Sequence, residues 1–271
     1  MKIEGRTFVI SGGASGLGQA TAEELVRAGG HVAVLDMNED NGAAVVSKLG
    51  ADKARFFQCN VTDTESIASA VQGTVEWVKE TGKPLGGVIP AAGISLPSTM
   101  LDRHNAPLSL PDFNFVLSVN LTGTIDLVRQ LLPHLAANAP VSPTGSSPED
   151  GDGERGVIIM VASAAAFEGQ RGQVSYAASK GAVAAMTLPM TRDLSRYGIR
   201  VVTLAPSLFE SAMTSLMSDK VRQSLEGAME FPRRAGRPEE FALAARHAVE
   251  NVMLNGAVIR LDGGMRMPSK L

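Results

Sequence analysis

The sequence predicts an α/β protein built on one doubly wound parallel sheet with helices on both faces. Short apolar runs rich in β-branched residues alternate along the chain with longer stretches of helical character. Such alternation is typical of right-handed βαβ units, whose strands are buried on both faces. The chain has 271 residues, of which 44% are hydrophobic, so it can bury a large core.

The expected elements follow one another without a break in composition or an internal repeat, so residues 1–271 are expected to form one domain. The runs of strand length are Thr7–Ile10, His31–Leu35, Gly87–Ile89, Val157–Val161, Val201–Leu204 and Ala257–Ile259, with a further strand expected just before Asn60. The helical stretches include Leu17–Ala28, Asp40–Leu49, Thr64–Lys79, Phe113–Leu132 and Ser175–Tyr197.

The first expected strand runs into the glycine-rich segment Ser11–Gly18, SGGASGLG, and a helical stretch follows. Glycines allow the backbone to turn sharply and to approach a pyrophosphate closely. The following helix offers unpaired N–H groups and the positive end of its dipole. A plain tight turn is the alternative, but the strand before and the helix after favour a dinucleotide site. The candidate residues are Gly12, Ser15, Gly16, Leu17 and Gly18.

The next strands end in residues that suit the rest of such a cofactor. Asp36 ends the second strand, where a carboxylate can accept hydrogen bonds from the adenosine ribose and would repel a 2′-phosphate, which favours NAD. Asn60 and Val61 follow the third strand, where the amide could hold the adenine amino group or simply end the strand. After the fourth strand, the small residues Ala91, Ala92 and Gly93 leave room for a flat cofactor.

Before the fifth strand, residues 139–156 read APVSPTGSSPEDGDGERG. Proline, serine, glycine and acidic residues dominate this segment, so we expect an exposed insertion on the surface. A linker between domains is the competing interpretation. The strand Val157–Val161 completes the same sheet, which favours the insertion.

A tyrosine and a lysine lie four residues apart in the run Ser175–Lys180, SYAASK, and therefore share one face of a helix. A free phenol has a pKa near 10, too high for a good base at neutral pH. The ammonium of Lys180 and a positive nicotinamide ring would lower the pKa of Tyr176. Ser163, at the end of the fifth strand, could donate a hydrogen bond to the oxygen of the substrate.

Together, SGGASGLG, Asp36, Ala91–Gly93, Asn120, Ser163 and YAASK resemble the short-chain dehydrogenase/reductase family over essentially the whole chain. The resemblance implies a Rossmann-type domain in which Tyr176 is the acid and base. It implies that Lys180 also holds the nicotinamide ribose and that Ser163 positions the substrate oxygen. It further implies that Asn120 supports a proton-relay water, although a helix-bending residue is the plainer alternative.

Longer stretches, such as AAFEGQRGQVSYAASKGAV, are similar to a subgroup of 3-hydroxyacyl-CoA dehydrogenases that also act on some hydroxysteroids. Membership of that subgroup implies NAD as cofactor, a homotetramer, and a substrate contact from Gln170 and Gln173. It also implies a cofactor contact from Pro206 and Phe209. Three sites depart from the family pattern. Asn60 replaces an aspartate, Ser207 replaces a glycine, and residues 210–214, expected near the substrate, also differ.

The chain ends in Ser269-Lys270-Leu271, a tripeptide that serves as a peroxisomal address, so a peroxisomal import receptor is an expected partner. A peroxisomal 3-hydroxyacyl-CoA dehydrogenase of fatty-acid β-oxidation fits this ending best. A reductase for a steroid, polyketide or other ketone, with NAD or NADP, is the nearest alternative. A protein that binds NAD without turnover is a third, which the presence of Ser163, Tyr176 and Lys180 disfavours.

Other classes are disfavoured by composition and spacing. The net charge of -3 gives no basic field for nucleic acid or a membrane surface, and no apolar run approaches a membrane span. The N-terminal residues show no leader pattern. The single cysteine, Cys59, cannot form an internal disulfide, and the four histidines lack metal-ligand spacing, so no metal is expected. Ser163 lies in VASAA, which lacks the Gly-x-Ser-x-Gly pattern of a hydrolase.

Overall fold

One parallel sheet organises the protein in a computed structural model that describes residues 1–141, 153–215 and 217–267. In the described chain its strands lie in the order β3-β2-β1-β4-β5-β6-β7. Their bounds are β1 Thr7–Ser11, β2 His31–Asp36, β3 Ala54–Gln58, β4 Leu85–Pro90, β5 Gly156–Val161, β6 Ile199–Pro206 and β7 Val258–Leu261. From β1 the chain adds β2 and β3 on one side, and it then returns to add β4 on the other side of β1. Ligands of such sheets bind at this switch point, outside the carboxyl ends of the strands.

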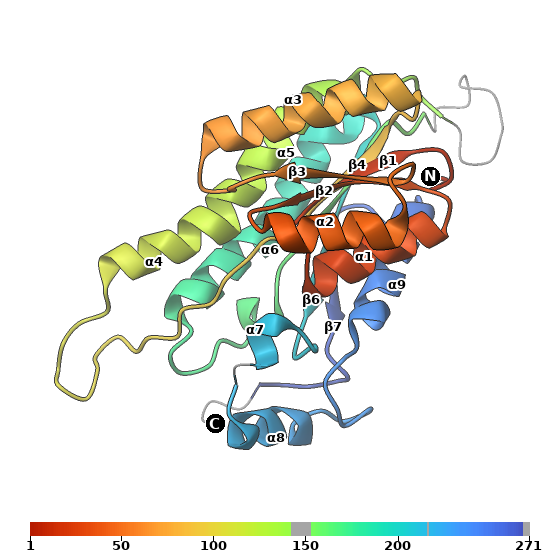
Figure 1. Ribbon diagram of the computed structural model, residues 1–271. Helices are drawn as coiled ribbons and strands as arrows, with labels where there is room; N and C mark the ends of the chain where they lie inside the picture. The colour runs from red at the N-terminus through yellow and green to blue at the C-terminus, as the bar shows by residue number, and fades with distance from the viewer. Residues whose placement is uncertain (142–152, 216, 268–271) are drawn as a thin grey trace.

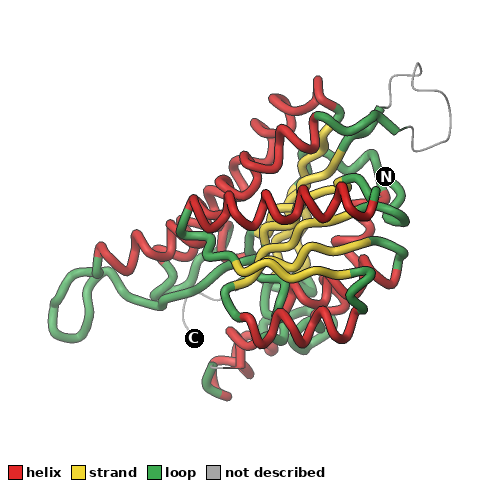
Figure 2. Tube along the Cα trace, turned by 45° about the horizontal axis from the view of Figure 1, so that its top comes forward, coloured by secondary structure: helices red, strands yellow, loops and turns green. Residues whose placement is uncertain are grey.

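Helices cover both faces of the sheet, as Figures 1 and 2 show. On one face lie α1 (Gly16–Arg27), α2 (Glu39–Leu49) and α9 (Pro238–Glu250). On the other lie α3 (Thr64–Thr81), α5 (Gly123–Ala136) and α6 (Val174–Leu194). The remaining α-helices of the described chain are α4 (Leu110–Leu117), α7 (Ala212–Ser215) and α8 (Asp219–Gly227). This three-layer arrangement confirms the fold class expected from the sequence.

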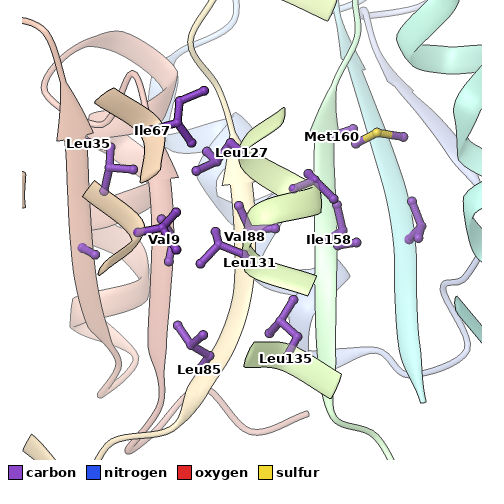
Figure 3. Close-up of a cluster of buried hydrophobic side chains, with 14 of the residues drawn as sticks. Val9, Leu35, Ile67, Leu85, Val88, Leu127, Leu131, Leu135, Ile158 and Met160 are labelled. Atoms are coloured by element: carbon purple, nitrogen blue, oxygen red, sulfur yellow. The ribbon is translucent and has the colours of Figure 1, made fainter. Parts of the chain in front are cut away.

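Alternate strand residues belong to two separate apolar cores. Val9 of β1 packs with α3 and α5, whereas its neighbour Ile10 packs with α1 and α9, because successive strand side chains point to opposite faces. Figure 3 shows the first core, where Leu127, Leu131 and Leu135 of α5 lie over β4 and β5. Because both faces of the sheet pack against buried apolar residues, the register of its strands is fixed, and with it the line of their carboxyl ends.

The expected strands agree with the observed ones to within a few residues at each end. One expected helix differs. The stretch Phe113–Leu132 was expected to be continuous, but a π-helical turn, η1 (Ser118–Thr122), separates α4 from α5. Such turns widen a helix locally and occur often at functional sites. The sequence pattern does not indicate it, because the apolar spacing continues through the turn.

The insertion expected at residues 139–156 is described only at its edges. Residues 142–152 lie outside the described chain, as do Ser269–Leu271. At its edges, Val141 and Glu154 form an antiparallel bridge. Glu154 is buried, not exposed as expected, because its carboxylate pairs with the buried guanidinium of Arg200 at 2.7 Å. Burial of an acid is tolerated where it is paired in this way.

Among the described helices, none is both long and apolar enough to cross a lipid bilayer.

Candidate active site

A cavity of about 770 Å³ follows the carboxyl ends of β2, β1, β4, β5 and β6. It brings together residues that lie far apart in the sequence. All the expected cofactor-binding residues line it: Gly12, Ser15, Gly16, Leu17, Gly18, Asp36, Asn60, Val61, Ala91, Ala92, Gly93, Tyr176, Lys180, Pro206 and Phe209. Ser163 lines it as well. A long cavity with this lining has the shape and polarity that a dinucleotide requires.

The glycine-rich loop lies between β1 and α1 and is tightly packed against its surroundings. Gly12 has a φ of +65°, and a Cβ there would stand 2.8 Å from the backbone nitrogen of Ala92. A Cβ on Gly18 would stand 2.2 Å from the carbonyl oxygen of Gly12. Ser15 precedes α1 without capping it through its side chain. The first N–H groups of α1 therefore face a narrow cradle that suits a pyrophosphate.

Asp36 and Asn60 occupy the opposite side of the glycine loop from the reactive residues. The two carboxylate oxygens of Asp36 accept hydrogen bonds from the backbone N–H of Ala14 (3.2 Å) and of Asn38 (3.1 Å). Each oxygen keeps a second lone pair, so the carboxylate can also accept from ribose hydroxyls. The side-chain oxygen of Asn60 accepts hydrogen bonds from the backbone N–H and hydroxyl of Thr62. The NH₂ group of Asn60 can then donate to a ring nitrogen of an adenine. It cannot hold the adenine amino group, as the sequence suggested, because that group is also a donor.

Ser163, Tyr176 and Lys180 meet over the ends of β5 and β6. Ser163 follows β5 and precedes a 3₁₀ turn, where its hydroxyl accepts from the N–H of Ala165 (3.2 Å) and approaches the carbonyl oxygen of Pro206 (3.4 Å). Tyr176 and Lys180 lie one turn apart on α6, with the ammonium 5.9 Å from the centre of the phenol ring. The ammonium donates to the carbonyl oxygen of Val161 at 2.8 Å.

Burial shifts the pKa values of both groups on α6. Burial raises the pKa of the Tyr176 phenol, and a hydrogen bond with Ser163 partly offsets this. Burial lowers the pKa of Lys180 from 10.5 to about 8. The direction for Tyr176 is opposite to the one expected from the sequence. In the chain alone, burial disfavours the charged phenolate more than the hydrogen bond from Ser163 favours it. The ammonium of Lys180 donates to the carbonyl oxygen of Val161, not to the phenol.

Asn120 lies in η1 and is fully buried behind the cavity lining. Its side chain accepts from the backbone N–H of Ile94 (2.8 Å) and donates to the carbonyl oxygen of Ile94 (2.9 Å). It also donates to the hydroxyl of Ser179, which in turn donates to the carbonyl oxygen of Tyr176 (2.7 Å). Asn120 therefore ties the segment after β4 to the turn of α6 that carries Tyr176.

Gln170 and Gln173, expected at the substrate, do not line the cavity. The side-chain oxygen of Gln173 accepts from the backbone N–H of Gln170 at 3.1 Å, and Gln170 is buried. Their segment also pairs with the loop after β4 through a bridge between Ser98 and Gln173. In this structure the two glutamines hold the segment that leads into α6.

Several lining residues carry no family signal in the sequence. Phe115 and Val119 reach the cavity from α4 and η1, and Thr62 reaches it from the loop after β3. The spacing of Phe115 and Val119 places them on one helical face, a signal that could have identified them as a pair. Ser207, Ser211 and Thr214 line the cavity beyond β6.

Comparisons with known proteins agree with this geometry. A family model described as short chain dehydrogenase matches residues 6–222. The chain is 41% identical to a 3-hydroxyacyl-CoA dehydrogenase type-2 of Rattus norvegicus, over 98% of this chain and 97% of the rat protein. A crystal structure of 3-hydroxyacyl-CoA dehydrogenase type-2 from Mycobacterium avium matches with a TM-score of 0.88 at 32% identity, covering 98% of both chains. A 3-ketoacyl-(acyl-carrier-protein) reductase from Brucella melitensis, solved with NADH, has a TM-score of 0.81 at 25% identity, with 98% of this chain and all of the other covered.

Proposed function

Because the chain belongs to the short-chain dehydrogenase family of oxidoreductases, we propose that it is an NAD-dependent 3-hydroxyacyl-CoA dehydrogenase. One observation carries the proposal: Ser163, Tyr176 and Lys180 meet at one end of a cavity whose other end presents Asp36. The 41% identity to the rat 3-hydroxyacyl-CoA dehydrogenase type-2 supports the choice of substrate class. The reaction would interconvert a secondary alcohol and a ketone.

The bound cofactor would supply or accept the hydride, and the protein would handle the proton. In the reductive direction, the Tyr176 hydroxyl donates its proton to the ketone oxygen, while Ser163 donates a hydrogen bond to the same oxygen. The raised pKa of Tyr176 suits this direction, because it keeps the phenol protonated at neutral pH. In oxidation, Tyr176 must lose its proton first, and the positive charge of Lys180 favours the phenolate.

Asp36 supports NAD as the cofactor. Its carboxylate is held at the end of β2 by two backbone N–H groups, and the next residues, Met37 and Asn38, carry no positive charge. A negative charge there repels a 2′-phosphate, which lacks a cationic partner at this position.

The direct test is the rate of NADH consumption with acetoacetyl-CoA and with a matched ketone that lacks CoA. We expect fast turnover of the thioester and little turnover of the ketone. Fast turnover of the ketone alone would refute the acyl-CoA assignment and favour a reductase for a specialised ketone.

The variant Tyr176→Phe tests the mechanism, because it removes only the hydroxyl that donates the proton. We expect turnover to fall by at least about a hundredfold, the usual contribution of a general acid, while NADH affinity stays nearly unchanged. Unchanged turnover in this variant would refute the role of Tyr176.

We further propose import into peroxisomes, supported by the terminal Ser269-Lys270-Leu271. A fluorescent protein fused before residue 1 should collect in peroxisomes, and the same fusion without residues 269–271 should remain dispersed. Peroxisomal signal from the truncated fusion would contradict this role of the tripeptide.

A further inference from the structure

Besides its hydrogen bond with Tyr176, the hydroxyl of Ser163 meets the protein backbone at two places. It accepts from the N–H of Ala165 at 3.2 Å and approaches the carbonyl oxygen of Pro206 at 3.4 Å. Both distances are long for hydrogen bonds, so these contacts by themselves hold the hydroxyl weakly. A hydroxyl that stabilises charge on a substrate oxygen needs a fixed position. The two backbone segments that it meets must therefore be held from elsewhere in the fold.

The turn that follows Ser163 ends at Glu168. In this turn, η3 (Ala164–Ala166), the backbone N–H of Ala166 donates to the carbonyl oxygen of Ser163 at 3.0 Å. The N–H of Glu168 donates to the carbonyl oxygen of Ala164 at 3.1 Å. Glu168 is thus connected through one short turn to the residue that directly follows Ser163.

The carboxylate of Glu168 is fastened to β7 and to the segment after it. Arg260 of β7 donates to both carboxylate oxygens, at 2.8 and 3.2 Å, and the backbone N–H of Met267 donates at 2.9 Å. The Arg260 guanidinium also lies 5.5 Å from the centre of the Phe167 ring. The hydrogen bonds from Arg260 lower the pKa of the Glu168 carboxyl, which therefore stays charged at neutral pH. Two parallel bonds from a guanidinium fix the orientation of a carboxylate as well as its distance.

The same part of the chain holds the other backbone partner of Ser163. In the pairing of β6 with β7, Pro206 is opposite Leu261. Beyond β7, Met265 is fully buried in a small apolar core with Leu208, which comes two residues after Pro206. Therefore β7 and the segment after it fix both places at which the hydroxyl meets the backbone.

We propose that Glu168 is a positioning residue that holds the turn after Ser163, and with it the Ser163 hydroxyl, in line with the substrate oxygen, an inference that rests on the proposed NAD-dependent function. Glu168 itself does not line the cavity, so it acts through Ser163 and not on substrate or cofactor. Without its carboxylate, Arg260 and the N–H of Met267 no longer hold the turn. A misplacement of about 1 Å at a reactive group can lower a rate by about a hundredfold.

The test is a double-mutant cycle of Glu168→Ala and Ser163→Ala, measured as kcat/KM at saturating NADH. The substrate is acetoacetyl-CoA or the matched ketone, whichever the wild type reduces, because the positioning role does not depend on the substrate class. We expect kcat/KM to fall about tenfold in Glu168→Ala and about a hundredfold in Ser163→Ala. The double variant should match Ser163→Ala to within about twofold, because a hydroxyl that is absent cannot be misplaced. Calorimetric titration should show unchanged NADH affinity in Glu168→Ala.

Glu24→Ala is the matched control, because Glu24 is also a carboxylate paired with an arginine, Arg246, at 3.0 Å between α1 and α9. It should lower the temperature of thermal unfolding and leave kcat/KM unchanged. Glu168→Gln keeps the shape of the side chain and one acceptor oxygen. It takes the place of the alanine variant in the cycle if that variant does not fold, and a smaller fall in kcat/KM is then expected.

Unchanged kcat/KM in the Glu168 variants would overturn the proposal. The same fold loss with and without the Ser163 hydroxyl would do so too, because Glu168 would then act independently of Ser163. A comparable loss in Glu24→Ala would assign the effect to stability alone and would likewise overturn it. A wild type that reduces neither ketone would instead refute the proposed function, and the positioning role with it.

Discussion

At the reactive end of the cavity, the buried charge of Lys180 lowers the stability of the folded protein. Its ammonium is buried, and within the described part of the chain it donates only to the carbonyl oxygen of Val161. Burial lowers the pKa of Lys180 from 10.5 to about 8. An ionic group buried with so little compensation destabilises the folded state. A purely structural α6 would carry an apolar residue here, so the cost points to a functional reason for the charge.

This cost predicts a pH dependence of stability for the cofactor-free protein. Between pH 8 and pH 10.5 the unfolded chain binds a proton at Lys180 that the folded chain does not, so stability rises with pH across this window. The shift corresponds to about 3 kcal/mol, at about 1.4 kcal/mol for each pKa unit. Urea unfolding at pH 7.5, 9 and 10.5 should therefore show Lys180→Met as the more stable protein at pH 7.5, with the difference shrinking as pH rises. A difference that stays constant with pH would contradict the shifted pKa.

Asp36 predicts the balance between NADH and NADPH. In Asp36→Ala, the ratio of kcat/KM for NADPH to that for NADH should rise by at least about tenfold, or about 1.4 kcal/mol, because the carboxylate no longer repels a 2′-phosphate. Asp36→Asn separates charge from hydrogen bonding, since its amide oxygen can still accept from the N–H of Ala14 or of Asn38. An unchanged ratio in both variants would mean that the ribose lies elsewhere.

For single residues, the sequence predicts those whose role follows from the chemistry of the side chain itself. Asp36, Ser163, Tyr176 and Lys180 all line the cavity, and each follows a strand or shares a helical face in a recognisable sequence pattern. The direction of the Tyr176 pKa could not be predicted, since it depends on desolvation by the whole fold. The partners of Asn120 are likewise long-range, as Ile94 and Ser179 come from other elements.

Among the elements, the contact between α5 and the loop after β3 links the helix framework to the end of the cavity that Asp36 and Asn60 line. Gly123, the first residue of α5, faces Val61, and a Cβ on Gly123 would stand 2.5 Å from the carbonyl oxygen of Val61. The loop that carries Asn60 and Val61 therefore rests directly on the start of the helix. A side chain at this position must push the loop away from α5.

Gly123→Ala should destabilise the protein by about 1–3 kcal/mol, as overpacking usually does, and should weaken NADH binding through displacement of Val61. Gly227→Ala is the matched control, at the last residue of α8, because a Cβ there would find no atom within 4 Å. That variant should gain up to about 1 kcal/mol from helix propensity. Thermal unfolding and NADH titration of both variants check the prediction, and equal stability changes would contradict it.

Elements with a strong local pattern are predictable from the sequence, and those shaped by tertiary contacts are not. The strands Thr7–Ser11 and His31–Asp36 were expected nearly as observed because apolar, β-branched runs adjoin clear turn residues. The π-helical turn η1 has no local signature, since Asn120 is held there by contacts with distant segments. The burial of Glu154 was missed for the same reason, because Arg200 is its partner across the fold.

For the whole molecule, α6 presents a feature that one chain does not explain. Its inner face carries Val183 and Leu194 into the core, as a sheet-covering helix requires. Its outer face is also apolar up to the exposed Arg192 in the last turn, with Val174 and Leu188 at 39% and 46% exposure and the exposed residues Ala178 and Ala185 between them. A helix that is apolar on all sides is normally buried on all sides. We propose that a second copy of the chain covers this face, in keeping with the homotetramer that the family resemblance implies.

The proposal predicts the effect of one charge placed on that face. Ala185→Glu should shift the protein to a smaller species in size-exclusion chromatography with light scattering, because an unpaired carboxylate cannot be buried cheaply at an interface. Ala44→Glu, at an exposed position of α2, carries the same change and should leave the assembly intact. Since α6 also holds Tyr176 and Lys180 on its inner side, the dissociated variant should unfold at a lower temperature and lose activity as protein concentration falls. A wild-type protein that is monomeric, or an Ala185→Glu variant of unchanged mass, would refute burial of this face by a second copy.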